Sequence, residues 1–194
     1  GKTIVCQMDP GTVEQDIVSK ERVQWTGWED DTQCVPEEYN DRRMKEWMTA
    51  VFVMVNSEWS AKALEAQGVD ASKIKIVPLA YEAQAGIRVD TPNARQRPFQ
   101  ILWIGQVILR KGIQYRMEAA RVQEKQNIEI RVIGPIGISR EAILKMPRNM
   151  RFEGVMNRDQ VSQAYRECDV FVLPTLSDGF AITQLEAMAY GLPV

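Results

Sequence analysis

The sequence predicts an α/β protein built from parallel, doubly wound sheets. The β-branched apolar run 51–55 is typical of a strand in a parallel sheet, and a further strand is predicted at 128–133. Helix-like stretches separate these runs, and strands that alternate with helices form parallel sheets. Residues 80–98 are rich in Gly, Pro, Asn, Gln and Arg, a composition that favours a connection between two such units.

The first unit, residues 1–82, gives clear signals mainly in its second half. Ser57 is a candidate N-cap for a helix that runs to Gln67 and ends at Gly68. The stretch 9–40 is polar and weakly periodic, so no element is predicted there. Strands are expected at 2–6, 51–55 and 74–77.

The second unit, residues 99–194, follows a linker placed at 83–98 and has the more regular pattern. Asn157 and Gln160 have the spacing of a capping box, which supports a helix start at Arg158. Because the chain stops just inside a new strand, we expect it to be a fragment in which both units are incomplete. Strands are expected at 100–104, 128–133, 150–152 and 170–173, and helices at 111–125, 139–145, 158–167 and 181–190.

The composition excludes several classes of function. The 194 residues are 45% apolar and 26% charged, with a formal net charge of -2, so no basic field for nucleic acid is expected. No segment approaches the roughly 18 consecutive apolar residues of a membrane-spanning helix. The sequence therefore predicts a globular protein without a transmembrane segment, for which peripheral contact with a membrane stays open.

Histidine is absent and cysteine is sparse. Without histidine, the Ser-His and Cys-His schemes of nucleophilic catalysis are excluded within this chain, and the commonest metal ligand is missing. Cys6, Cys34 and Cys168 form no CxxC pair, so free thiols in a reducing compartment are expected. These features predict a cytoplasmic location and no metal site.

Two carboxylates, Asp178 and Glu186, mark the point where a strand turns into a helix near the end of the chain. Ligands of open parallel sheets bind at such points, and a helix start offers N–H groups to phosphate while carboxylates accept hydrogen bonds from hydroxyls. This chemistry indicates a nucleotide sugar. The alternative is that both are ordinary acids near a helix start. At helical spacing they lie about 80° apart and roughly 12 Å along the axis, too far for one acid–base pair.

The turn from Gly105 to Gly112 contains two adjacent cations, Arg110 and Lys111, at the start of the expected helix. Cations are unfavourable at a helix N-terminus unless an anion offsets them, so their position indicates a bound phosphate. A solvated charged turn is the alternative.

These residues together resemble a known family. The stretches 105–112, 152–154, 169–174 and 178–194 agree in order and spacing with the retaining, two-domain glycosyltransferases of group 1, or family 4, which have the GT-B architecture. The resemblance is strongest over 99–194 and weaker over 53–82. It implies two facing Rossmann-like domains, a nucleoside diphosphate sugar as donor, transfer with retention, and neither a cofactor nor an essential metal.

The resemblance also implies roles for individual residues. Lys111 would bind the diphosphate and stabilise the leaving group, Glu186 would accept hydrogen bonds from the ribose, and Asp178 would hold a hydroxyl of the donor sugar. We count these three as the catalytic set. The further expected substrate-binding residues are Gly105, Gln106, Arg110, Gly179, Phe180 and Ala181.

The sequence departs from the family pattern at two of these positions. The family usually has glutamate where Asp178 stands, and Gln106 replaces a common phosphate-binding arginine, which leaves Arg110 as its possible substitute.

The expected function is transfer of a sugar, of hexosyltransferase type, from the donor to a glycan, a lipid-linked acceptor or a small hydroxyl compound, in the cytoplasm or at the inner face of its membrane. Two alternatives stay open: a nucleotide-sugar epimerase of the same architecture, and a non-catalytic nucleotide-binding or assembly module.

Overall fold

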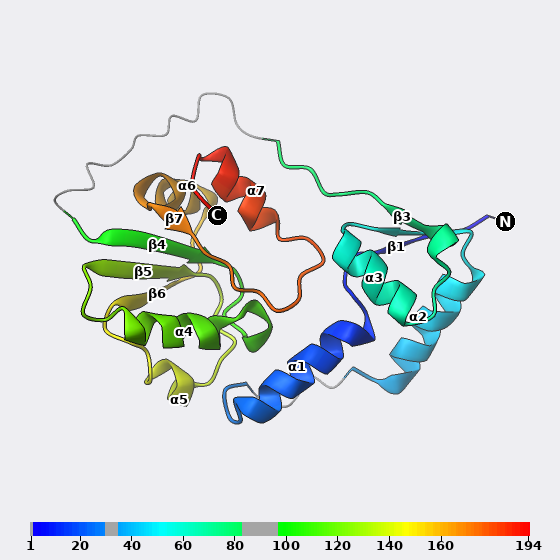
Figure 1. Ribbon diagram of the computed structural model, residues 1–194, viewed down its shortest axis with the longest axis horizontal. Helices are drawn as coiled ribbons and strands as arrows, with labels where there is room; N and C mark the ends of the chain where they lie inside the picture. The colour runs from blue at the N-terminus through cyan, green and yellow to red at the C-terminus, as the bar shows by residue number, and fades with distance from the viewer. Residues whose placement is uncertain (1, 30–34, 83–96) are drawn as a thin grey trace.

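Two parallel sheets, each with its own helices, make up the protein (Figure 1). The computed structural model describes residues 2–29, 35–82 and 97–194. The smaller sheet has the strand order β1-β2-β3 and the larger sheet the order β6-β5-β4-β7, with every described strand pair parallel. The predicted α/β fold class is therefore confirmed. The predicted domain limits stay a prediction, because residues 83–96 of the predicted linker 83–98 lie outside the described residues.

The smaller sheet packs its helices around a compact apolar core. Trp47, Val53, Val55 and Leu64 are almost completely buried there. Ser57 caps α3, as predicted, by accepting a hydrogen bond from the Ser60 backbone N–H. The elements are β1 (Ile4–Gln7), α2 (Glu37–Thr49), β2 (Phe52–Val55), α3 (Glu58–Ala66), the short 3-10 helix η1 (Ala71–Lys73) and β3 (Ile74–Ile76).

The larger sheet is buried on both faces. Successive residues of β4 point to opposite sides, so Trp103 belongs to the core with Ile113 and Met117 of α4, whereas Leu102 belongs to the core with Tyr165 of α6. The capping box of Asn157 and Gln160 is present. The elements are β4 (Phe99–Ile104), α4 (Ile113–Val122), β5 (Ile128–Ile133), α5 (Arg140–Ile143), β6 (Met150–Gly154), α6 (Arg158–Glu167), β7 (Val170–Phe171) and α7 (Ile182–Ala189).

The predicted start of the helix at Lys111 is wrong. Leu109–Lys111 forms a separate 3-10 turn, η2, and α4 begins only after Gly112. Gly112 has a left-handed φ of 74°, and a Cβ atom there would lie 1.9 Å from the carbonyl oxygen of Pro174. Lys111 therefore precedes the helix instead of lying in its first turn, and the helix dipole by itself does not require an anion beside it.

The sequence did not indicate α2 or α1 (Thr12–Gln24), and α1 lies between the two sheets (Figure 1). None of its residues is fully buried, so it lacks the apolar stripe from which periodicity identifies a helix. The loop after it reaches the larger sheet, where Trp28 joins the core that contains Trp103. Residues near the start of the chain thus complete the core of the second unit.

Other expectations can be compared with the described residues. Cys6 is an exposed free thiol and Cys168 a buried one, while Cys34 lies outside the described ranges. Within those ranges, no helix is long and apolar enough to cross a membrane. The same part of the chain contains no cluster of three His, Cys, Asp or Glu residues suited to a metal ion.

Candidate functional site

The loops that follow β4 and β7 meet at one edge of the larger sheet. β4 lies between β5 and β7, so the direction in which strands are added reverses at β4. Parallel sheets of this kind bind ligands at the carboxyl ends of the strands that flank such a reversal. Lys111 follows β4 and Asp178 follows β7, which places both predicted residues at this point.

Lys111 and Asp178 form an ion pair between their ammonium and carboxylate groups. Their side chains are only 16% and 15% exposed. The pair joins residues that are 67 positions apart in sequence. The alternative of a freely solvated lysine at this turn is therefore wrong for this structure.

Arg110 is directed at the loop that carries Asp178. Its Nη1 donates to the backbone oxygen of Ser177 at 2.9 Å and lies 3.5 Å from Glu14 Oε2. The buried Ser177 hydroxyl donates to the same carboxylate oxygen at 2.8 Å. Arg110 thus fixes the loop before Asp178 with the help of a residue from α1, and its role as a substitute for the arginine missing at position 106 stays a prediction.

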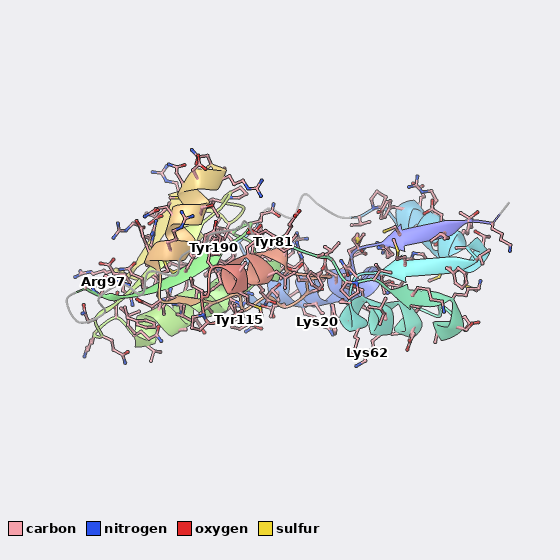
Figure 2. All side chains as sticks on the ribbon, turned by 90° about the horizontal axis from the view of Figure 1, so that it is seen from above. Lys20, Lys62, Tyr81, Arg97, Tyr115 and Tyr190 are labelled. Carbon is pink, nitrogen blue, oxygen red and sulfur yellow. The ribbon has the colours of Figure 1, made fainter. Side chains whose placement is uncertain are left out.

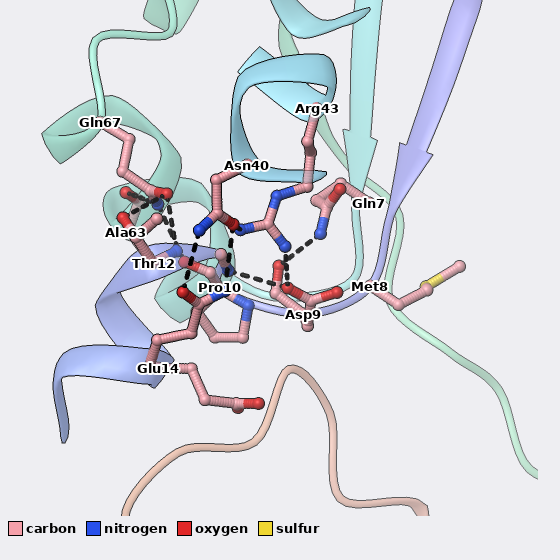
Figure 3. A network of polar contacts seen from close by, with 12 residues as sticks. Gln7, Met8, Asp9, Pro10, Thr12, Glu14, Asn40, Arg43, Ala63 and Gln67 are labelled. Atoms are coloured by element: carbon pink, nitrogen blue, oxygen red, sulfur yellow. Dashed lines mark hydrogen bonds and ion pairs between the residues drawn. The ribbon is translucent and has the colours of Figure 1, made fainter. Parts of the chain in front are cut away.

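Gly179 lies against the first unit. A Cβ atom there would be 1.8 Å from the Met8 carbonyl oxygen, so only glycine allows this approach. The loop that contains Met8 is itself braced, because Asp9 Oδ1 accepts hydrogen bonds from the Gly11 N–H at 2.9 Å and Arg43 Nη1 at 3.1 Å (Figure 3). The two units therefore meet at the predicted sugar-binding loop.

The turn after Gly179 leads into α7. Phe180 is partly buried, and Ala181 is the N-cap residue of α7. Alanine has no side-chain acceptor for the first-turn N–H groups, which makes these groups suitable for an anion.

Glu186 has a separate set of partners. It projects from α7, and its Oε2 accepts a hydrogen bond of 2.9 Å from the Tyr165 hydroxyl. Burial, followed by the charge of Glu186, raises the pKa of Tyr165 well above its ordinary value. Tyr81 of the first unit lies near Tyr190 (Figure 2), and burial and then the Glu186 charge raise its pKa as well. Glu186 therefore has a phenol as its hydrogen-bond partner, whereas Asp178 is paired with a cation.

Gly105 and Gln106 form the turn directly after β4. A Cβ atom on Gly134 would lie 1.8 Å from the Gly105 carbonyl oxygen, so the two loops are in close backbone contact. Gln106 is exposed at the sheet edge. Both residues border the point of strand reversal, and their predicted role in substrate binding stays a prediction.

Three carboxylates of the first unit, which the sequence analysis did not select, contact η2 and α4 of the second unit. Glu14 contacts Arg110, Glu21 accepts hydrogen bonds from Gln114 and Tyr115, and Glu29 accepts one from the Leu109 N–H. Glu14 and Glu21 are seven residues apart, a spacing that places them on one helix face. This spacing could have identified them if a helix had been predicted over 12–24.

The comparisons with known proteins agree on one family. The model of "Glycosyl transferases group 1" matches residues 98–194, half of the chain. An uncharacterized glycosyltransferase, MJ1607, of Methanocaldococcus jannaschii is 34% identical over 101 residues, which are 48% of this chain and 26% of that protein. The amylovoran biosynthesis glycosyltransferase AmsK of Erwinia amylovora is 27% identical over 151 residues, 70% of this chain and 36% of that protein.

Solved structures show the same fold. Anabaena Alr3699/HepE, in complex with UDP and glucose, superposes with a TM-score of 0.68 at 17% identity and covers 100% of this chain and 52% of that one. The lipopolysaccharide outer core galactosyltransferase WaaB has a TM-score of 0.60 at 20% identity, over 79% of this chain and 45% of that one. The regions matched in MJ1607 and AmsK are well under half of the length of those two relatives.

The strand reversal, the residues placed beside it and the family match point in the same direction. The chain belongs to the glycosyl transferases of group 1 and has the fold of GT-B glycosyltransferases.

Proposed function

We propose that this chain forms the donor-binding part of a retaining glycosyltransferase, of hexosyltransferase type, which moves a sugar from a nucleoside diphosphate to a hydroxyl of a glycan, a lipid-linked acceptor or a small molecule. The observation that carries the proposal is the Lys111–Asp178 ion pair at the carboxyl ends of β4 and β7. A cation and a hydrogen-bond acceptor thus lie at the end of the sheet at which parallel sheets bind their ligands.

The proposed mechanism starts with an exchange of partners. The donor diphosphate takes the place of the Asp178 carboxylate at the Lys111 ammonium, and Asp178 becomes available to a sugar hydroxyl. As the bond between the sugar and the diphosphate breaks, negative charge grows on the leaving phosphate, and Lys111 stabilises it at a position set before the reaction. N–H groups in the first turn of α7 add to this stabilisation.

Related structures support a uridine nucleotide as the first donor to test. Anabaena Alr3699/HepE was solved with UDP-glucose, and TarM of S. aureus with UDP. The catalytic domain of starch synthase IV from Arabidopsis thaliana was solved with ADP instead. The base is therefore to be determined by titration with UDP, ADP and GDP.

The test is calorimetric titration of the chain with these three nucleotides without added metal and with EDTA. We expect one of them to bind, and Lys111→Ala and Glu186→Ala each to weaken its affinity by about tenfold or more. Lys125→Ala and Glu124→Ala are matched controls on exposed positions and should leave affinity unchanged. Wild-type affinity in both site variants would contradict the site, and loss of binding with EDTA would contradict metal independence.

An activity assay identifies the acceptor and the anomeric configuration of the product. It also distinguishes the transferase from the two alternatives, the epimerase and the non-catalytic module. A sugar nucleotide incubated with the protein and candidate acceptors should give a glycoside of unchanged anomeric configuration. Free nucleotide and an isomerised sugar formed without acceptor would support an epimerase, and binding without turnover a non-catalytic module. The location in the cytoplasm, or at the inner membrane face, stays a prediction that cell fractionation tests.

A further inference from the structure

Tyr165 connects two helices on one face of the larger sheet. It lies on α6, and its hydroxyl reaches Glu186 Oε2 on α7 at 2.9 Å and the Thr183 backbone oxygen at 3.3 Å. The Tyr165 residue is only 1% exposed. The phenol therefore contacts Glu186 from the interior of the protein, on the side away from solvent.

The ring of Tyr165 is held in a fixed orientation. It stacks on Tyr190 with a centroid distance of 5.1 Å and an interplanar angle of 15°, and Phe171 contacts it from another direction at 6.2 Å. Tyr190 is anchored in turn, because its hydroxyl donates to Ser162 Oγ at 2.8 Å. A buried ring in such surroundings has little freedom to change its rotamer.

The direction of the hydrogen bond follows from the chemistry of its two groups. A carboxylate can only accept, so the phenol is the donor. Burial and the nearby Glu186 charge raise the pKa of Tyr165, so the phenol keeps the proton that it donates. The contact uses Oε2, and no hydrogen bond to Oε1 comes from the part of the chain that the structure describes, so Oε1 can accept from a ligand.

We infer that Tyr165 is a positioning residue that holds the Glu186 carboxylate in the orientation in which it binds the ribose hydroxyls of the donor. The inference rests on the proposed function, because it assigns to Glu186 a nucleotide-binding role. Tyr165 itself is buried behind Glu186 and acts through it. Removing only the phenolic oxygen should free the carboxylate to rotate and weaken binding of the ribose, because the fixed geometry must then be recovered on binding.

The experiment compares Tyr165→Phe with Tyr190→Phe by calorimetric titration. Both variants keep the stacked rings and lose one hydroxyl. The Tyr165 hydroxyl donates to the Glu186 carboxylate, whereas the Tyr190 hydroxyl donates to Ser162. The probes are UDP and 2′,3′-dideoxy-UDP, which lacks the hydroxyls that Glu186 would bind. Thermal melts establish that each variant is folded.

We expect Tyr165→Phe to weaken UDP binding about tenfold, or about 1.4 kcal/mol, and to change dideoxy-UDP binding less than about twofold. Tyr190→Phe should bind both probes as the wild type does. In a Glu186→Ala background, Tyr165→Phe should have no further effect on UDP, because a residue that acts through another is not additive with it.

Three results would overturn the inference. If Tyr165→Phe weakens both probes equally, or fails to fold while Tyr165→Trp binds UDP normally, the phenol has only a structural role. If Glu186→Ala weakens UDP binding but Tyr165→Phe does not, the site stands without this positioning contact. If the folded wild-type chain binds no nucleoside diphosphate, the proposed function fails and the inference with it.

Discussion

Single residues in this protein show how strongly the energetic cost of burying a charge depends on whether the charge has a partner. Lys111 and Asp178 are mostly buried but neutralise each other. Arg116 is 5% exposed, and its Nε and Nη2 have no hydrogen-bond partner among the described residues. Burial lowers the pKa of Arg116 to about 10. In the first arrangement each charge has an opposite charge beside it, whereas in the second the buried charge has no such partner and costs stability.

We therefore expect Arg116→Leu to stabilise the chain by about 1–2 kcal/mol, because leucine buries no charge at this position. Arg151→Leu is the control, since the Arg151 side chain is 67% exposed and its loss should change stability little. Urea denaturation of both variants at neutral pH measures the difference. A loss of stability in Arg116→Leu would show that the guanidinium has a stabilising partner.

Cys168 provides a pH-dependent test. Burial raises the pKa of its thiol from 9.0 to about 11. Between these values the unfolded chain releases a proton that the folded chain keeps, so the contribution of Cys168 to stability is complete below pH 9 and is lost as the pH rises to 11. Between pH 8 and pH 10.5, the free energy of unfolding of the wild type should fall by about 2 kcal/mol more than that of Cys168→Ala. Equal losses in both proteins, measured from urea midpoints, would refute the raised pKa.

Among the secondary-structure elements, the turn between β4 and α4 determines where Lys111 lies. Gly112 separates η2 from α4, and the close approach of Pro174 leaves no room for a side chain. The loop after β7 is thereby brought against the turn after β4. The position of the ion pair thus depends on a glycine that takes no part in it.

Gly112→Ala should destabilise the chain by more than about 4 kcal/mol, because it combines a left-handed φ with an overlap of backbone atoms. Gly154→Ala is the matched control, since Gly154 has a φ of 73° and a Cβ atom added there would meet nothing within 4 Å. That change should cost only about 1–2 kcal/mol. Thermal melts of the two variants measure the two losses of stability. Equal losses would mean that Pro174 moves aside.

For the whole molecule, α1 and the loop after it join the two sheets. The carboxylates of Glu14, Glu21 and Glu29 contact η2 and α4, and Trp28 lies in the core of the larger sheet. Contacts between residues far apart in the sequence therefore support the candidate donor site. The two sheets should unfold together as a result.

Trp28→Ala should lower the stability of the larger sheet by about 3–5 kcal/mol, because it leaves a cavity in that core. Val23→Ala, at a residue that is 80% exposed, should change stability by less than about 0.5 kcal/mol. Hydrogen exchange of amides in β4 and β5 reports the effect where it is expected. Unchanged protection of these strands in Trp28→Ala would show that the loop after α1 is not part of this cooperative unit.

Local sequence patterns were sufficient to predict most of the larger sheet. β5 and α6 occur with the predicted limits, and the capping box of Asn157 and Gln160 is present, because local patterns of burial and capping specify such elements directly. The same patterns selected Lys111, Asp178 and Glu186, since strand-to-helix turns carry recognisable residues. They failed at α1, whose contacts are polar and distant in sequence, and at α2, whose sequence is mostly polar.

Which partner each selected residue has is set by long-range packing. Lys111 meets Asp178 because β4 and β7 are neighbours, and Glu186 meets Tyr165 because α6 and α7 share one face of the sheet. The contact of Gly179 with Met8 depends on how the two units approach each other. Such pairings follow from the order of strands and the packing of helices, whereas local sequence patterns act only over a few residues along the chain.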